Sequence, residues 1–202
     1  GMSTLGRTFL CEAPYTGSIR WGNQELRTLS PRDISATVGY LGHDPELLSD
    51  SIRNNILLGR DDDAWKYLRA VCLEDEVKAM PNGLDTRVGD GGVRLSGGQQ
   101  QRLALARTLA HPRPLLVLDD PFSALDRKTE EQVFANLRKM TAGSTVLLIS
   151  HRLYLFPQMD GVLWIQDGKA VCAAHEELMA QNPQYAALVN AQEGGEQDEP
   201  EK

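Results

Sequence analysis

A short apolar run that ends in two carboxylates constrains the fold more than any other segment of this 202-residue chain. Leu115 to Leu118 are consecutive aliphatic residues, and Asp119 and Asp120 follow directly. A run without polar alternation is typical of a strand buried on both faces, and such strands occur mainly in parallel sheets covered by helices. Functional groups of these folds gather beyond the carboxyl ends of the strands. The run therefore predicts an α/β fold with a site at Asp119 and Asp120.

The segments that follow predict strands and helices in alternation. Thr145 to Ile149 is a second candidate for a buried strand, and Ser150 and His151 come directly after it. A helix is expected between the two strands, because three apolar residues fall at helical spacing before Gly143. These residues are Val133, Leu137 and Met140. Such alternation favours a mainly parallel sheet with both polar pairs at one edge.

Shorter elements are predicted from composition and turn signals. A helix is expected from Ser3 to about Cys11, and Asp167 and Gly168 mark a hairpin turn. The other expectations are strands at Ser18–Trp21 and Thr37–Leu41, a helix at Ala64–Val71, hairpin strands at Val162–Ile165 and Ala170–Ala173, and one or two helices within Glu176–Asn190.

The string Leu95-Ser96-Gly97-Gly98-Gln99 is the most specific in the chain, and a helix is expected to begin behind Ser96. Glycines let backbone N–H groups approach an anion, the serine adds a donor, and the helix presents its positive end. The residues alone fit two interpretations about equally: an anion-binding turn, or a glycine turn that only caps a helix. The neighbouring motifs favour the first.

Several motifs resemble, in order and spacing, the nucleotide-binding domain of ATP-binding cassette transporters. LSGGQ is similar to the signature motif of that family, and the apolar run with Asp119 resembles its Walker B strand. Ser123 to Asp126 resembles its D-loop, and Ser150-His151 resembles its switch histidine. The resemblance implies a P-loop NTPase-like, three-layer α/β domain with a mainly parallel sheet. It also implies a helical signature subdomain at about residues 45–110.

Three further stretches narrow the resemblance to exporter-type cassettes. Leu48 to Ile56 resembles their F-x-G-T-I-x-x-N-I stretch, Val88 to Gly92 their VGE-x-G segment, and Ala174 to Leu178 their G-x-H-x-E-L ending. The resemblance implies a domain that binds ATP and Mg²⁺ and couples ATP hydrolysis to transport. It also implies two partners, a second cassette and a transmembrane domain, and a place at the cytoplasmic face of the membrane.

The resemblance further implies roles for individual residues. Mg²⁺ would be bound by Ser3 and Asp119, Asp120 would position the attacking water, and His151 would contact the γ-phosphate. His43 occupies the position of the Q-loop glutamine. The residues implied to bind ATP are Ser3, Thr4, Ser96, Gly97, Gly98, Gln99 and Asp126.

The first residues depart from the family pattern. A phosphate-binding P-loop reads GxxxxGK(S/T), whereas this chain begins Gly1-Met2-Ser3-Thr4, so that Met2 stands at the lysine position. Met2 is either a start methionine or a substitution, and the sequence does not separate the two. In both cases we expect a cassette over residues 1–190 that is truncated at the Walker A motif and lacks its N-terminal strands.

Two departures in the catalytic motifs predict a weakened site. Asp120 replaces a glutamate, which draws the carboxylate back, and a misplacement of ~1 Å can lower a rate about a hundredfold. His43 replaces a glutamine, and histidine is a poor ligand for Mg²⁺. Because the signature, Asp126 and His151 are intact, we expect the weakened half of an asymmetric pair. The alternatives are a regulatory cassette that only completes a partner's ATP site, and a soluble cassette ATPase acting on nucleic acid.

Charge and composition argue against the nucleic-acid alternative. The chain has 21 basic and 28 acidic residues, a net charge of −7, whereas nucleic-acid binding depends on clustered Lys and Arg. Residues 191–202 are predicted to form a disordered acidic tail. Cys11, Cys72 and Cys172 are expected to be buried thiols in a reducing compartment. No apolar run approaches the ~18 residues that span a bilayer, so membrane attachment would need a partner or a missing segment.

Overall fold

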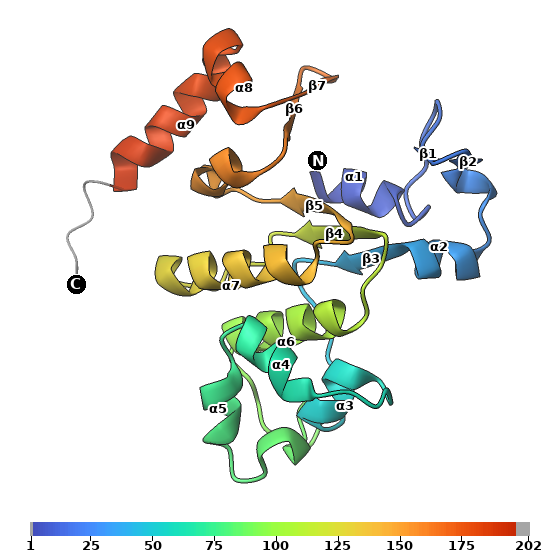
Figure 1. The fold of residues 1–202 in the computed structure, drawn as a ribbon, viewed down its shortest axis with the longest axis vertical. Helices are drawn as coiled ribbons and strands as arrows, with labels where there is room; N and C mark the ends of the chain where they lie inside the picture. Colours follow the sequence, from blue (N-terminus) through green and yellow to red (C-terminus); the bar gives the residue numbers. More distant parts are fainter. Residues whose placement is uncertain (1, 197–202) are drawn as a thin grey trace. The chain divides into compact units, whose positions relative to one another are not determined.

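The computed structural model describes residues 2–196 and divides the chain into two compact units (Figure 1). The first unit ends at Ile149 and the second begins at Ser150. A parallel sheet with its helices makes up the first unit, and a β-hairpin followed by two helices makes up most of the second. The domain boundary expected near residue 190 stays a prediction.

A three-stranded parallel sheet in the order β3-β4-β5 forms the centre of the first unit. It consists of β3 (Val38–Leu41), β4 (Leu115–Asp119) and β5 (Thr145–Ile149), and Leu118 pairs with Leu41 on one side and with Leu148 on the other. All of β4 is buried, because it has a neighbouring strand on each side and helices cover both faces of the sheet (Figure 1). The predicted buried parallel strand is confirmed.

Helices cover both faces of this sheet (Figure 1). α1 (Met2–Thr8) packs on β4 through Gly6, where an added Cβ would lie 3.2 Å from Val117. α6 (Gly97–Ala110) and α7 (Arg127–Met140) lie on the opposite face. This arrangement confirms the predicted three-layer α/β fold. α1 also confirms the helix expected near the start of the chain, although it ends at Thr8.

Expectations about burial are wrong in detail for β5 and for the three thiols. β5 is buried only at Ile149 because, among the described residues, it pairs with β4 alone and forms an edge of the sheet. Cys11 and Cys172 are exposed, since one lies in the turn after α1 and the other on a largely exposed strand. Cys72, the third expected buried thiol, is only partly buried.

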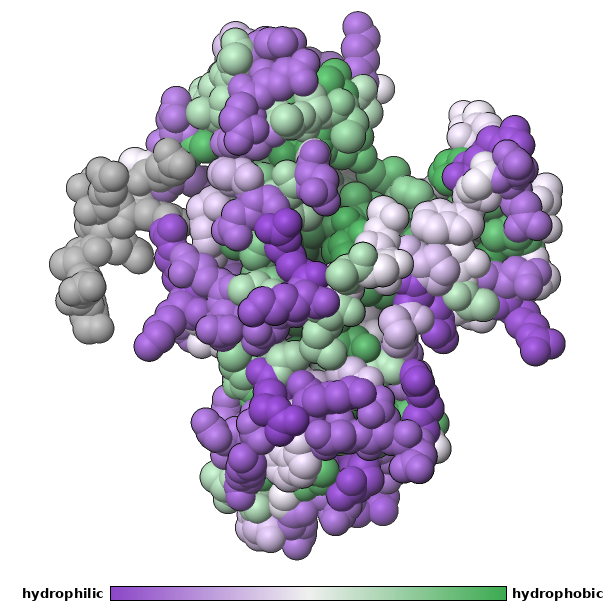
Figure 2. All heavy atoms as spheres, viewed as in Figure 1, coloured by the Kyte–Doolittle hydropathy of each residue, from purple (hydrophilic) through white to green (hydrophobic). Residues whose placement is uncertain are grey.

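The chain between β3 and β4 forms the predicted helical region. Its helices are α3 (Ile52–Leu57), α4 (Ala64–Ala70), α5 (Glu74–Lys78) and α6, with a short 3-10 turn, η2, at Gly83–Asp85. Their packing buries Ile52, Ile56, Leu68 and Leu103 completely. On the face that Figure 2 shows, the surface of this region, in the lower part of the view, is mainly hydrophilic.

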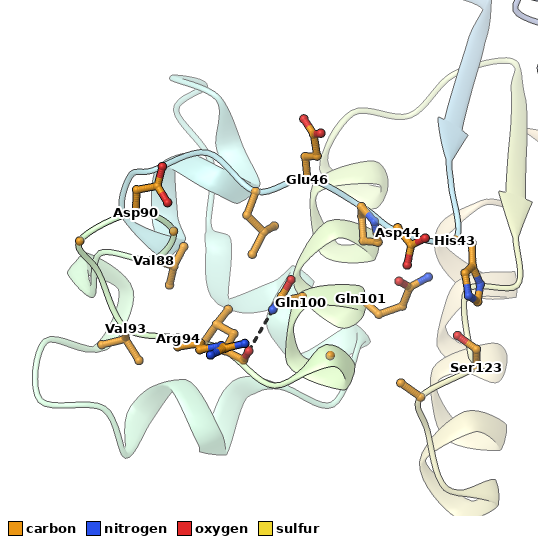
Figure 3. A pocket seen from close by; sticks show the side chains of 17 residues that line it. His43, Asp44, Glu46, Val88, Asp90, Val93, Arg94, Gln100, Gln101 and Ser123 are labelled. Atoms are coloured by element: carbon orange, nitrogen blue, oxygen red, sulfur yellow. Dashed lines mark hydrogen bonds between the residues drawn. The ribbon is translucent and has the colours of Figure 1, made fainter.

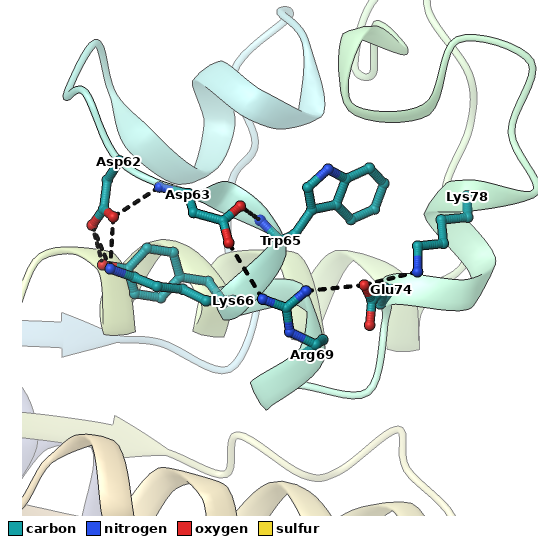
Figure 4. A network of polar contacts seen from close by, with 8 residues as sticks. Asp62, Asp63, Trp65, Lys66, Arg69, Glu74 and Lys78 are labelled. Carbon is teal, nitrogen blue, oxygen red and sulfur yellow. Dashed lines mark hydrogen bonds and ion pairs between the residues drawn. The ribbon is translucent and has the colours of Figure 1, made fainter.

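A network of ion pairs lies on the surface of α4 and α5 (Figure 4). Lys66 Nζ is 2.6 Å from Asp62 Oδ1, and Arg69 pairs with both Asp63 and Glu74. Asp63 also caps α4, because its side chain accepts a hydrogen bond from the N–H of the second helical residue. These contacts connect the loop before α4 to the beginning of α5.

The segment between α1 and β3 contains a small hairpin and two short helices. β1 (Arg20–Trp21) and β2 (Gln24–Glu25) are antiparallel around Gly22, and η1 (Leu26–Thr28) and α2 (Pro31–Thr37) follow. Ser30 caps α2 by accepting a hydrogen bond from the N–H of Asp33. The predicted strands near 18–21 and 37–41 are confirmed with shorter bounds.

The second unit is built around one small core. η3 (Leu153–Gln158) precedes the antiparallel pair β6 (Val162–Gln166) and β7 (Lys169–Ala173), and α8 (His175–Gln181) and α9 (Pro183–Glu196) follow. Tyr185 is fully buried, with its ring 5.4 Å from that of Trp164 and its hydroxyl 2.7 Å from His175 Nδ1. The hairpin was predicted, and the two helices agree with the expected one or two, although α9 extends beyond Asn190.

The predicted acidic tail, 191–202, overlaps the end of α9, and residues 197–202 lie outside the described residues. Within the described part of the chain, no helix combines the length and apolar character that a membrane span requires.

Candidate active site

The carboxylate pair predicted from the sequence lies at the carboxyl end of β4. Asp119 is the last residue of the strand and is 4% exposed. Its Oδ2 accepts a hydrogen bond from the hydroxyl of Tyr40, on the neighbouring strand β3, at 3.3 Å. Burial, together with the nearby Asp119 carboxylate, raises the pKa of Tyr40, so its hydroxyl stays protonated and donates. Asp119 is thus a buried carboxylate held in place by a hydrogen bond from the adjacent strand.

Asp120 follows the strand in an unusual backbone conformation. Its φ is +50°, in the left-handed region that few residues other than glycine, asparagine and aspartate adopt. Its N–H donates to the carbonyl of Ile149 at the end of β5, at 2.8 Å. This turn directs the side chain toward the loop after β3, where His43 Nδ1 lies 3.9 Å from Asp120 Oδ2. The structure therefore brings together His43 and Asp120, the two residues that depart from the family pattern in its catalytic motifs.

Ser3 and Thr4 belong to the first turns of α1, which packs on β4. Figure 1 shows the N-terminal end of α1 on the same side as the arrowheads of β3, β4 and β5. Ser3, the second residue of α1, is exposed. A serine hydroxyl and an aspartate carboxylate are hard oxygen donors of the kind that Mg²⁺ prefers, so the residues fit the predicted ion.

The signature residues form the N-terminus of α6. Ser96 is the N-cap, and its Oγ accepts a hydrogen bond from the N–H of Gln99 at 3.2 Å. In return, Gln99 Oε1 accepts from the N–H of Ser96 at 2.8 Å, which completes a capping box. Ser96 and Gly97 are exposed, so this helix end faces solvent. The predicted role of Ser96 as a helix cap is confirmed.

The D-loop lies directly against the signature. A Cβ added to Gly98 would lie 3.0 Å from the carbonyl oxygen of Ala124, so the two backbones approach closely. Asp126 caps α7, because its Oδ1 accepts from the N–H of Thr129 at 3.0 Å. Hydrogen bonds from the backbone and side chain of Thr129 lower the pKa of Asp126, which keeps its carboxylate ionised.

A pocket of about 840 Å³ connects several of these motifs (Figure 3). Its walls come from the loop after β3, from the segment before the signature, and from α6 and the D-loop. Gln101 lines it from α6; the residue is 3% exposed, and its Nε2 has no hydrogen-bond partner. The sequence analysis did not select Gln101. The available signal was an amide residue on a helix whose other buried positions are mostly aliphatic.

His151 belongs to the second unit and follows β5 directly in the sequence. Its side chain is exposed, and its carbonyl accepts a hydrogen bond from Gln192 Nε2 on α9 at 2.6 Å. Gln192 Oε1 also accepts from the N–H of Leu153, at 3.0 Å. Ser150, the preceding residue, is buried and accepts from the N–H of Arg152. Within this unit, α9 therefore holds the backbone on both sides of residue 152.

These features define a class of protein. A parallel sheet covered on both faces, with carboxylates at the end of its central strand and α1 packed on that strand, is the arrangement of the P-loop NTPase fold. Residues 1–123 match the family described as ABC transporter, and the chain belongs to that family.

Known proteins similar to this chain include a bacterial flippase, an animal P-glycoprotein and a bacterial exporter of known structure. It is 40% identical over 198 residues to an ATP-dependent lipid A-core flippase of Burkholderia pseudomallei (strain 1710b), covering 93% of this chain and 33% of the relative. It is 37% identical to P-glycoprotein 14 of Caenorhabditis elegans, covering 89% of this chain and 14% of that protein. A solved bacterial Atm1-family ABC exporter with ATP bound matches with a TM-score of 0.87 at 31% identity, over 95% of this chain and 35% of that one. The chain thus spans about a third of the length of the flippase.

Proposed function

We propose that this chain is the ATP-binding part of an exporter-type transporter and couples ATP binding and hydrolysis to transmembrane transport. Its own ATP site is catalytically weakened, and its intact signature completes the site of a partner cassette. The observation that carries this proposal is the contact between His43 and Asp120, 3.9 Å apart. Both residues depart from the family pattern, whereas Ser96 to Gln99 keep it.

The site residues divide into three roles. Ser3 and Asp119 hold Mg²⁺, and this ion, when bound, neutralises charge on the phosphate oxygens. Asp120 orients the attacking water, and His151 binds the γ-phosphate. The shorter arm of Asp120 and the imidazole of His43 give this constellation less reach than a glutamate and a glutamine would. We therefore expect this site to bind ATP and to hydrolyse it slowly.

The exposed end of α6 is the part offered to a partner. Ser96 and Gly97 face solvent, and a helix N-terminus with glycines attracts a phosphate group. The nucleotide bound there belongs to a second cassette, whose own Walker motifs hold its other side. Transport itself requires a transmembrane domain, which places this chain at the cytoplasmic face of a membrane.

The substitution Asp120→Glu tests the catalytic part of the proposal. In the full-length gene product, we expect micromolar ATP binding with slow turnover, measured by titration and by phosphate release. Asp120→Glu extends the carboxylate to the usual length of a glutamate, and we expect it to raise ATP turnover by about tenfold to a hundredfold. Asp120→Asn, which keeps the shorter arm without the charge, is the matched control and does not raise it.

Two other results would support the alternatives. One result would identify a regulatory cassette without catalysis: the full-length product does not bind ATP, but the activity of the partner still depends on Ser96. Turnover that increases only on addition of DNA or RNA would favour a nucleic-acid ATPase. Brisk hydrolysis by a homodimer of the unmodified protein would contradict the weakened site.

A further inference from the structure

Glu76 contacts the signature motif although it lies outside every motif in the sequence. It is part of α5, and its Oε2 accepts a hydrogen bond from Gln99 Nε2 at 2.7 Å. Its Oε1 lies 2.7 Å from Arg102 Nη1, so both oxygens of the carboxylate have partners. The two contacts connect α5 to the first turns of α6.

This contact determines which way the Gln99 amide is turned. The amide has one acceptor, Oε1, and two N–H donors on Nε2. Oε1 accepts from the N–H of Ser96, and a reversed amide would direct donors at that N–H. A carboxylate accepts hydrogen bonds but does not donate them, so Glu76 stabilises only the orientation that closes the capping box.

Arg102 keeps Glu76 in place. Its side chain is 12% exposed, its Nη1 also donates to the carbonyl of Cys72 at 2.6 Å, and its Nε donates to the carbonyl of Gly98 at 3.3 Å. Burial raises the pKa of Glu76, but hydrogen bonds from Gln99 and Arg102 outweigh this and lower it overall. Glu76 is therefore ionised at neutral pH, where charge-assisted hydrogen bonds are strongest.

We propose that Glu76 is a positioning residue for the signature motif: by fixing the Gln99 amide, it holds the N-terminus of α6 in the geometry that receives a nucleotide. The consequence for ATP turnover rests on the proposed function above. The consequence for the backbone of the signature does not, because it concerns only the capping box.

The test compares Glu76→Gln with Glu74→Gln. Glu74 is on the same helix, but its carboxylate pairs with Arg69 and Lys78 at the surface, so its substitution controls for a lost charge on α5. In Glu76→Gln, an amide nitrogen must face a donor from either Gln99 or Arg102. Hydrogen exchange at the Ser96 N–H should become roughly tenfold faster in Glu76→Gln, as expected for loss of a charge-assisted hydrogen bond, and remain unchanged in Glu74→Gln.

ATP turnover by the assembled full-length protein is the second measurement. We expect Glu76→Gln to lower it about tenfold. In a Gln99→Ala background, Glu76→Gln should lower it no further, because Glu76 acts through that amide. Unchanged exchange at Ser96, or losses that add fully in the double variant, would overturn the proposal. If the unmodified protein does not turn over ATP, the proposed function fails, and the exchange measurement still decides the role of Glu76.

Discussion

At the scale of single residues, the two glycines of the signature have different surroundings. A Cβ added to Gly98 would lie 3.0 Å from the carbonyl oxygen of Ala124, whereas one added to Gly97 would meet nothing within 4 Å. We expect Gly98→Ala to lower the free energy of unfolding by about 1–3 kcal/mol, because the D-loop backbone must move. Chemical denaturation measures this change.

Gly97→Ala is the matched control for this prediction. It makes the same chemical change one residue earlier, in open space, and we expect it to be neutral or stabilising by up to about 1 kcal/mol, since alanine favours a helix over glycine. Equal effects of the two substitutions on stability would show that the close approach to Ala124 is not rigid.

The sequence predicted some residue contacts of the site and not others, for a physical reason. The cap of α6 was predictable because Ser96 and Gln99 are three residues apart, and capping depends on local geometry. The contact of Gln99 with Glu76 spans 23 residues, and that of His43 with Asp120 depends on two neighbouring strands ending at one edge. Contacts of this kind depend on the folded sheet and the helical region.

At the scale of elements, the ion pairs on α4 make stability depend on pH (Figure 4). Hydrogen bonds from Lys66, Tyr67 and the N–H of Asp63 lower the pKa of Asp62 to about 2, from an ordinary value of 3.8. The stabilisation from Asp62 is therefore fully present above pH 3.8 and is lost as the pH falls toward about 2. We expect Asp62→Asn to melt at a lower temperature than the unmodified protein at neutral pH, with the difference disappearing at low pH.

Asp61→Asn provides the control for the pH dependence. Asp61 is the exposed neighbour of Asp62, and its replacement by asparagine removes the same single negative charge. Thermal melts of both variants from neutral to acidic pH distinguish the specific contact from a general charge effect. A difference in melting temperature that is the same for both variants would contradict a role for the Asp62 contacts.

Whole elements were predicted well where the signal was local and less well where burial depended on neighbours. The apolar run gave β4, and the turn at Asp167 and Gly168 gave the β6–β7 hairpin, because period and turn residues act within a few positions. The partial exposure of β5 depends on which strands surround it. No pattern within Thr145–Ile149 contains that information.

At the scale of the whole molecule, the proposed asymmetric pair makes the two ATP sites unequal. We expect Ser96→Ala in this chain to lower total ATP turnover of the assembled transporter by about tenfold or more, because it alters the partner's competent site. Asp120→Asn should lower it by less than about twofold, because it affects the site that already contributes little. Phosphate release from the transporter, purified with its partner cassette, measures both.

A symmetric assembly gives a different result. In a homodimer each site contains both Ser96 and Asp120, so the two substitutions should cause comparable losses. Gln132→Ala, on the exposed surface of α7, serves as a control for assembly. Comparable losses with Ser96→Ala and Asp120→Asn would therefore contradict the asymmetric pair.

The left-handed backbone at Asp120 also affects how a substitution there would change conformational stability. Aspartate tolerates a φ of +50° better than glutamate, because its short side chain bonds locally to the backbone. Asp120→Glu, which on the proposed function lengthens the catalytic reach, should therefore lower the free energy of unfolding, by up to about 1 kcal/mol. On the proposed function, Asp120→Glu should therefore raise ATP turnover and lower conformational stability at the same time.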